Sequence, residues 1–225
     1  MPAIREIIFI LNKNLFTCLV VLSAFFVQEV SAVDYTVNDM KGLKNAISAA
    51  NPGDVITLED GQYDGGLSIT DVSGSADNPI TLQGGKGAIF TNAKDKSIPI
   101  IAEADFPGGG SSISMVGSSY WVFKGFTIAF SQRGLIVQEG SDYNTFDDLV
   151  FHDFTRNACK IRRDSSFNVV KNCEIYNCGM GLENDKNKGE GVYIGTAIAP
   201  DKPFDQSNGN QILNCYFHDI TSIKN

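Results

Sequence analysis

The chain has 225 residues, of which 43% are hydrophobic, 10% aromatic and 20% charged, with 22 glycines and 7 prolines. These fractions exclude a collagen-like chain, a low-complexity disordered chain and a helical membrane bundle. The 26 acidic residues outnumber the 18 basic ones, which gives a formal net charge of −8. Because affinity for nucleic acid depends on neutralising phosphates, we expect no nucleic-acid partner.

The first 32 residues have the pattern of a secretory signal peptide. Arg5 and Lys13 precede an apolar run over residues 15–27, and Val30-Ser31-Ala32 supplies small residues for cleavage. A membrane anchor is the alternative, but a span needs roughly 20 apolar residues and this run is shorter. We therefore expect a signal peptide over residues 1–32 and a secreted, extracellular domain over residues 33–225. We expect that domain to be a monomer without membrane contact.

The mature chain begins with a predicted helix and a series of short strands. Met40, Leu43, Ile47 and Ala50 recur at helical spacing, with Asn38 as the expected N-cap and residues 51–53 (Asn-Pro-Gly) as the stop. Such a helix would cover the open end of a stack of strands, which otherwise exposes unpaired edge groups. Strands are predicted at Val55–Leu58, Leu67–Ile69, Ile80–Leu82 and Ile98–Ile101.

Four segments of the second half repeat one pattern. They begin at Trp121, Asn144, Asn168 and Asn210, at intervals of 23, 24 and 42 residues. Three positions of the repeat are apolar throughout: Phe123/Phe146/Val170/Ile212, Phe126/Leu149/Cys173/Cys215 and Ile128/Phe151/Ile175/Phe217. A period in the twenties with short β segments indicates a solenoid. Leucine-rich repeats share the period, but their leucine frame is absent.

A turn-forming residue separates the first two apolar positions of each repeat: Gly125, Asp148, Asn172 or Asn214. In a parallel β-helix each coil stacks on the next at the strand spacing of roughly 4.8 Å, so that like residues lie over like. Asn172 and Asn214 would then form an amide ladder. We predict an all-β fold: a single-stranded right-handed parallel β-helix (a solenoid) with a short N-terminal helix cap.

A second strand follows in each coil. The segments starting at Gly134, Ala158 and Gly191 align, and strand alternation sends two rows of side chains outward on one face. The rows are Ile136/Lys160/Tyr193 and Gln138/Arg162/Gly195, and Lys224 would continue the Arg162 row. The position before each segment is Arg133, Asn157 or Glu190.

Four cysteines follow the predicted signal peptide, namely Cys159, Cys173, Cys178 and Cys215. An even number in a secreted chain permits disulfides, and stacked positions lie within disulfide reach. We favour buried thiols that act as small hydrophobic side chains, with a disulfide as the alternative.

Several segments resemble a known family. Residues 49–58 (AANPGDVITL), 60–63 (DGQY) and 78–82 (NPITL) resemble the N-terminal coils of chondroitinase B-like, alginate lyase-like and pectate lyase-like β-helix proteins. Residues 120–126 (YWVFKGF) are similar to their next strand, and residues 189–196 (GEGVYIGT) to a motif of secreted β-helix repeat proteins. The resemblance covers roughly residues 35 to 225 and implies the pectin lyase-like fold. It does not align a catalytic Lys and Arg motif residue by residue, and the repeat is still in progress at Asn225, as a truncated C-terminus would leave it.

β-Elimination on a uronate polysaccharide needs a cation for the carboxylate, a base for the α-proton and an acid for the leaving oxygen. Lys160, Arg162 and Tyr193 are the candidate catalytic residues, because they share one outward face. Arg163, Glu190 and Lys224 are the candidate substrate-binding residues. Residues 156–171 contain five basic residues and one acidic residue, a cationic strip that suits an anionic substrate. The alternative is a solvated outer face without chemistry.

Acidic residues offer a second kind of site. Glu183 and Asp185 lie in an insertion before the Tyr193 strand and are candidate ligands for Ca²⁺, although the spacing is an incomplete calcium loop. Asp147 and Asp148 could form a hydrolase pair or a Ca²⁺ site, but the repeat favours a structural role for them.

The sequence therefore predicts a secreted protein that acts on an acidic polysaccharide, with a lyase as the first hypothesis. A non-catalytic glycan-binding or structural β-helix is the alternative, and a glycoside hydrolase is the third.

Overall fold

The computed structural model describes residues 31–92, 110–179, 189–196 and 204–220. The chain divides into two units, Met1–Ser31 and Ala32–Asn225, and the fold below is that of the second unit. Within the described ranges, no helix is long and apolar enough to cross a bilayer.

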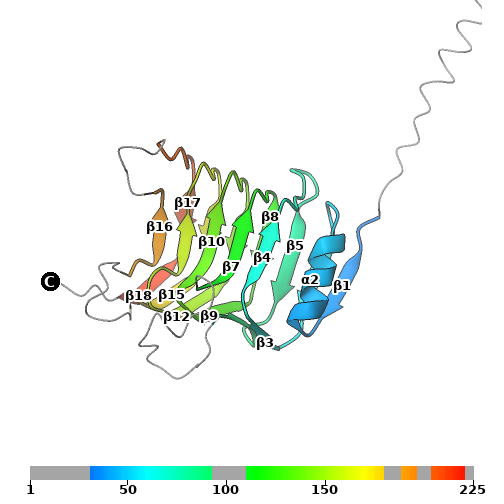
Figure 1. The fold of residues 1–225 in the computed structure, drawn as a ribbon, viewed down its shortest axis with the longest axis horizontal. Helices are drawn as coiled ribbons and strands as arrows, with labels where there is room; N and C mark the ends of the chain where they lie inside the picture. The colour runs from blue at the N-terminus through cyan, green and yellow to red at the C-terminus, as the bar shows by residue number, and fades with distance from the viewer. Residues whose placement is uncertain (1–30, 93–109, 180–188, 197–203, 221–225) are drawn as a thin grey trace, which may run out of the picture. The chain divides into compact units, whose positions relative to one another are not determined.

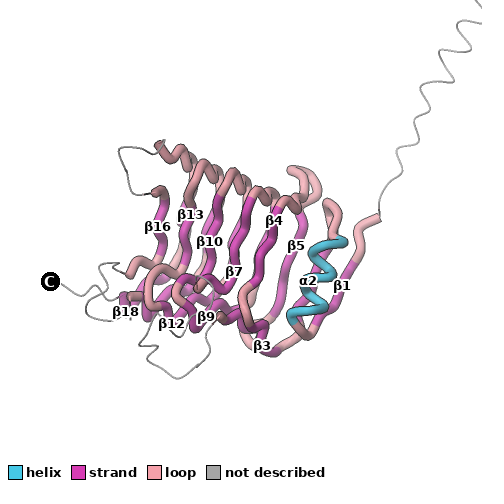
Figure 2. The backbone as a smooth tube through the Cα atoms, viewed as in Figure 1, coloured by secondary structure: helices cyan, strands magenta, loops and turns pink. Residues whose placement is uncertain are grey.

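Three parallel sheets form the described part of this unit, and the chain visits them in turn (Figure 1, Figure 2). The seven-stranded sheet contains β1 (Asp34–Val37), β2 (Val55–Leu58), β5 (Ile80–Gly84), β8 (Trp121–Lys124), β11 (Thr145–Asp147), β14 (Val169–Lys171) and β17 (Gln211–Leu213). The six-stranded sheet contains β3 (Gly61–Asp64), β6 (Ala88–Thr91), β9 (Thr127–Ser131), β12 (Val150–Phe154), β15 (Glu174–Cys178) and β18 (Tyr216–Ile220). The five-stranded sheet contains β4 (Leu67–Thr70), β7 (Ser111–Val116), β10 (Arg133–Gln138), β13 (Cys159–Ile161) and β16 (Val192–Ile194).

The apolar columns predicted from the repeat form the interior. Phe146 pairs in register with Phe123 on one side and with Val170 on the other. Phe151 likewise pairs with Ile128 and Ile175. Because strand neighbours are stacked coils, each apolar side chain packs on its counterpart one repeat away. The all-β parallel solenoid is confirmed, and its predicted strands at residues 55–58, 67–69 and 80–82 are present; the one at residues 98–101 lies outside the described residues.

In each of the four repeats, the turn that leads from the seven-stranded sheet to the six-stranded sheet contains a residue with a left-handed backbone. Gly125, Asp148, Asn172 and Asn214 have φ of 87°, 53°, 56° and 56°. Glycine, asparagine and aspartate tolerate this conformation better than other residues, which explains why the repeat places them here. The predicted amide ladder is present: Asn214 Nδ2 donates to Asn172 Oδ1 at 3.4 Å.

A second asparagine ladder lies deeper, and the sequence argument did not identify it. Asn168 Oδ1 accepts from the backbone N–H of Asn144 and from its Nδ2, both at 3.0 Å. Asn210 Oδ1 accepts from the backbone N–H of Asn168 at 2.9 Å and from its Nδ2 at 3.0 Å. These side chains satisfy the backbone N–H groups of Asn144 and Asn168, directly before β11 and β14.

The helix α2 (Met40–Ala49) lies beside β1 at the first end of the stack (Figure 1). Its Leu43, Ala46 and Ile47 side chains are buried in the core. The helix cap is therefore confirmed, but the expected N-cap Asn38 is wrong. Asp39 occupies that position because its Oδ1 accepts the backbone N–H of Gly42 at 2.6 Å.

The four cysteines after residue 32 are free thiols, as the analysis of the columns favoured. Burial raises the pKa of Cys173 to about 12 and that of Cys178 to about 12. These thiols therefore serve as small apolar side chains of the core.

Candidate functional site

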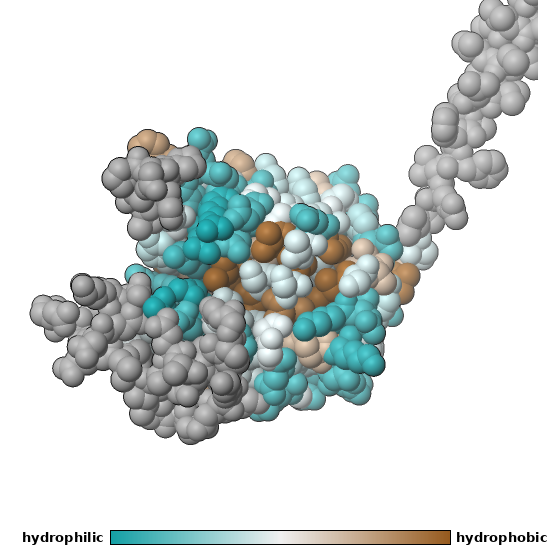
Figure 3. Space-filling model, viewed as in Figure 1, coloured by the Kyte–Doolittle hydropathy of each residue, from teal (hydrophilic) through white to brown (hydrophobic). Residues whose placement is uncertain are grey.

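The outer face of the five-stranded sheet brings the predicted catalytic residues together. Lys160 pairs in register with Ile136 on one side and with Tyr193 on the other. The predicted outward row is therefore formed by adjacent strands. Figure 3 shows that hydrophilic residues gather over the β13 end of this face, whereas paler and apolar residues cover β7 and β4.

Lys160 lies over the aromatic ring of Tyr193, with its Nζ 4.4 Å from the ring centroid. This is the geometry of a cation–π contact, which holds a long and flexible side chain in one place. Burial lowers the pKa of Lys160, and the neighbouring cations Arg162, Arg133 and Arg156 lower it further, while Glu190 opposes them. A lysine in this environment gives up its proton more readily than a solvated lysine does.

Glu190 stands beside this pair. Its backbone carbonyl accepts the N–H of Ala158, and its carboxylate accepts a hydrogen bond from Asn157 Nδ2. The predicted position of Glu190, one coil from Asn157, is therefore confirmed. Burial raises the pKa of Glu190, while Lys160 and the Asn157 hydrogen bond partly offset that rise. The carboxyl group thus holds a proton more strongly than an exposed glutamate does.

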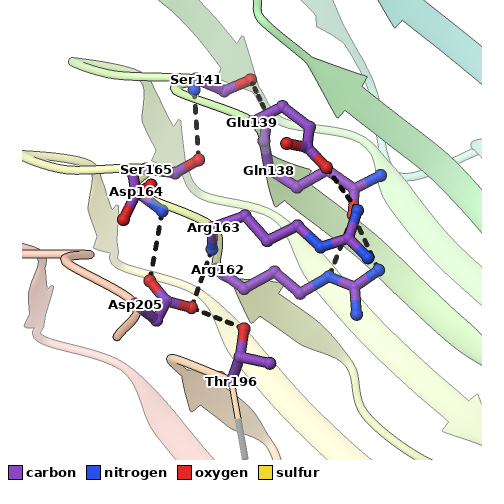
Figure 4. Close-up of polar contacts among 9 residues, drawn as sticks. All are labelled: Gln138, Glu139, Ser141, Arg162, Arg163, Asp164, Ser165, Thr196 and Asp205. Carbon is purple, nitrogen blue, oxygen red and sulfur yellow. Dashed lines mark hydrogen bonds and ion pairs between the residues drawn. The ribbon is translucent and has the colours of Figure 1, made fainter. Parts of the chain in front are cut away.

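Arg162 occupies the second outward row next to Gln138. Its Nε and Nη2 both donate to Gln138 Oε1, at 2.9 and 2.7 Å (Figure 4). The sequence argument had named Arg162 as a candidate catalytic residue and did not identify this contact. Gln138 is neutral, so it orients the guanidinium without forming an ion pair, while the carboxylates of Glu139 and Asp205 partly compensate its charge.

Arg163 is oriented differently. Its side chain forms an ion pair with the Glu139 carboxylate, and its backbone N–H donates to Asp205 Oδ2 at 2.8 Å (Figure 4). Thr196 Oγ1 donates to the same oxygen at 2.6 Å. Burial favours the neutral form of Asp205, but hydrogen bonds from Ser207, Thr196 and the backbone of Arg163 and Asp164 hold its pKa well below the usual range. Asp205 therefore fixes the turn that carries Arg162 and Arg163.

Sequence reasoning missed two cations of the site, Arg133 and Arg156. Both lie close enough to Lys160 to lower its pKa. The alignment had placed Arg133 next to the outward rows, and Arg156 lies just before the β13 segment, so the signal was present. Asp205 and Thr196 had no such signal, because they lie within the 42-residue interval between Asn168 and Asn210, in which the repeat spacing is lost.

Three predicted residues lie outside the described residues: the expected Ca²⁺ ligands Glu183 and Asp185, and the substrate-binding candidate Lys224. Within the described ranges, no three His, Cys, Asp or Glu side chains are grouped so that they could hold a metal ion.

The aspartate pair on the seven-stranded sheet makes structural contacts. Asp148 pairs with Lys86 at 3.0 Å, and Asp147 pairs with Lys171 at 3.5 Å and accepts from Asn172 at 2.7 Å. His152 and His218 flank Tyr176 in one stacked column of the six-stranded sheet.

The family model for the right-handed β-helix region matches residues 65–222. The chain therefore belongs to the right-handed β-helix family. Pectate lyase L of Dickeya chrysanthemi is 29% identical over 137 residues, which are 58% of this chain and 31% of that protein. The chain thus spans about a third of the length of the curated relatives it matches.

Solved structures share the fold. An alginate lyase from Paenibacillus sp. str. FPU-7 superposes with a TM-score of 0.69 at 23% identity, over 83% of this chain and 58% of that one. The pectate lyase Pel9A superposes with a TM-score of 0.56 at 20% identity, over 85% of this chain and 51% of that one. The pectin lyase-like β-helix inferred from the sequence motifs is confirmed.

Proposed function

We propose that this protein is a secreted polysaccharide lyase that cleaves an acidic, uronate-containing polysaccharide by β-elimination. The observation that carries the proposal is the position of Lys160: a partly buried lysine with a lowered pKa, 4.4 Å from the Tyr193 ring centroid and surrounded by arginines. The relatives named as pectate lyase and the structural neighbours named as alginate and pectate lyases support it.

Each requirement of the reaction has a candidate group on this face. The guanidinium groups of Arg162 and Arg133 neutralise the uronate carboxylate, which makes the proton on the adjacent carbon more acidic. The free amine of Lys160 takes that proton, and the electron pair forms a carbon–carbon double bond as the bond to the glycosidic oxygen breaks. Glu190, whose pKa is raised, donates a proton to the departing oxygen.

Tyr193 has two roles in this proposal. Its ring stabilises the ammonium that Lys160 becomes after it takes the proton. Its hydroxyl is a second group on this face that can donate or accept a proton, in keeping with the prediction of Tyr193 as a candidate catalytic residue. Arg163 contributes positive charge at the edge, although Glu139 compensates part of it.

Ca²⁺ remains an expectation that rests on Glu183 and Asp185, and no step above depends on it. Calorimetric titration of Ca²⁺ into the wild type and a Glu183→Gln/Asp185→Asn variant tests the expectation. Equal heats for the two proteins would remove it.

Replacement of Lys160 by methionine tests the lyase proposal. Methionine keeps much of the side-chain volume but cannot accept a proton, and a general base contributes about 10²–10⁴-fold to a rate. We expect Lys160→Met to lower the rate of unsaturated-uronate formation, followed by ultraviolet absorbance, by at least about 10²-fold.

Lys171→Met is the matched control, because Lys171 is a partly exposed lysine on β14 of the seven-stranded sheet. Its rate should match that of the wild type. A Lys160→Met variant with full activity would refute the role of Lys160. A wild type that binds uronate polymers but never produces the absorbance would favour the non-catalytic glycan-binding alternative.

A further inference from the structure

The face that carries Lys160 changes its chemical character from one end to the other. Two rows run across the five-stranded sheet in register. Over β13 and β16 they carry Lys160, Arg162 and Tyr193. Over β4, β7 and β10 they form an uncharged strip, defined by Ser68, Thr70, Ser114, Val116, Ile136 and Gln138.

The strip provides hydroxyl and aliphatic groups instead of cations. Ser68 Oγ and Thr70 Oγ1 lie 3.1 Å apart, and either can donate to or accept from a sugar hydroxyl. Ile136 is only 6% exposed, and Val116 lies two strands from Arg162 in the second row. Figure 3 shows the same change, from hydrophilic residues over β13 to paler and apolar ones over β7.

A carboxylate is also repelled at this end of the face. A side chain on Gly117, which follows β7, would approach Asp71 Oδ1 to 2.6 Å, so the Asp71 carboxylate lies against the end of that strand. Asp71 is exposed and directly follows the β4 residue Thr70. Among the described residues of β4 and β7 there is no cation, so a uronate bound there would give up water without gaining one from these strands, and it would meet a like charge.

Strands lie roughly 4.8 Å apart, so β4, three strands from β13, lies about 14 Å from the strand that carries Lys160. A polysaccharide that lies along the stack therefore crosses both regions. We propose that the substrate carries its cleaved uronate over β13 and β16, beside Arg133 at the start of β10, and uncharged pyranoses over β4 and β7. The preferred polymer has uronates next to uncharged sugars, not a continuous run of free carboxylates.

This inference rests on the proposed function and narrows its substrate class. Uncharged pyranoses have two sources, a neutral sugar or a uronate whose carboxyl group is esterified. Three polymers separate the possibilities: unesterified polygalacturonate, methyl-esterified polygalacturonate, and a backbone in which galacturonate alternates with a neutral sugar. The initial rate of double-bond absorbance and the affinity in calorimetry are measured on each.

We expect kcat/KM on the esterified or the alternating polymer to exceed that on polygalacturonate by roughly tenfold or more. The faster of the two identifies the source of the uncharged sugar. Val116→Lys places a cation on the strip, so it should raise kcat/KM on polygalacturonate and shrink the preference about fivefold.

Val122→Lys is the matched control, because Val122 is a half-buried outward valine of β8 on the seven-stranded sheet. It should leave the preference unchanged. A faster rate on polygalacturonate that Val116→Lys does not alter would overturn this inference and leave the lyase function intact. If no polymer is cleaved, the lyase function fails. The affinities of the three polymers, measured with the wild type and with Val116→Lys, then still test whether uncharged sugars bind over the strip.

Discussion

Replacement of Asn168 by alanine should destabilise the fold more than its size suggests. The side chain is fully buried and serves both neighbouring coils. Its loss removes the acceptor of the Asn144 backbone N–H at 3.0 Å and the donor to the Ser141 carbonyl at 3.1 Å. A buried polar group left without a partner costs about 1–3 kcal/mol, so two such groups predict a loss of about 2–6 kcal/mol in the free energy of unfolding.

Urea denaturation measures this loss directly. Trp121 is the single tryptophan and is fully buried, and its backbone N–H bonds to the same ladder, so its fluorescence reports unfolding of this region. Asn172→Gly is the matched control: it removes an exposed ladder amide while keeping the left-handed backbone, and should cost no more than about 0.5 kcal/mol. Equal unfolding free energies for the two variants would refute the reasoning that buried and exposed ladders differ.

Two further predictions follow from the ionisable groups. Because the proposed mechanism needs Lys160 deprotonated and Glu190 protonated, kcat/KM should be bell-shaped in pH, with the inflection set by Lys160 below the usual lysine pKa value of 10.5. Arg133→Met removes one of the lowering cations and should move that inflection to higher pH; an unmoved inflection would argue against Lys160 as the titrating group. Cys173 and Cys178, with pKa raised to about 12, should resist a thiol reagent at pH 8 in the native protein and react in urea, as mass spectrometry of labelled peptides would show.

The fold and the rows of the site could be predicted because both depend on the repeat. Once Phe146 is aligned with Phe123, strand alternation determines that Lys160 points outward beside Tyr193. The alignment of the outward side chains therefore follows from the alignment of the apolar residues, which take no part in the chemistry. The N-cap was misassigned because Asn38 and Asp39 are both good caps, and only the backbone decides which side chain reaches Gly42.

Contacts made outside the repeat could not be predicted in the same way. Asp205 contacts the turn after β13 although it lies 42 residues from Arg163, within the interval in which the period is lost. The contact of Arg162 with Gln138 depends on side-chain conformation, which spacing alone does not determine. Pattern arguments thus locate a face, whereas the partners of each charged group require coordinates.

Because side chains alternate along each strand, the inward residues contribute to stability and the outward residues to the chemistry of the face. In β13, Cys159 and Ile161 are buried in the core, whereas Lys160 between them faces outward. A change at an outward position alters the charge of the face but leaves the inward columns in place. The rows can therefore differ from strand to strand, from Ser114 through Ile136 to Lys160, without a change of register. That independence allows a regular solenoid to carry a face that is uncharged at one end and cationic at the other, and it is why an outward substitution such as Val116→Lys tests recognition without also testing folding.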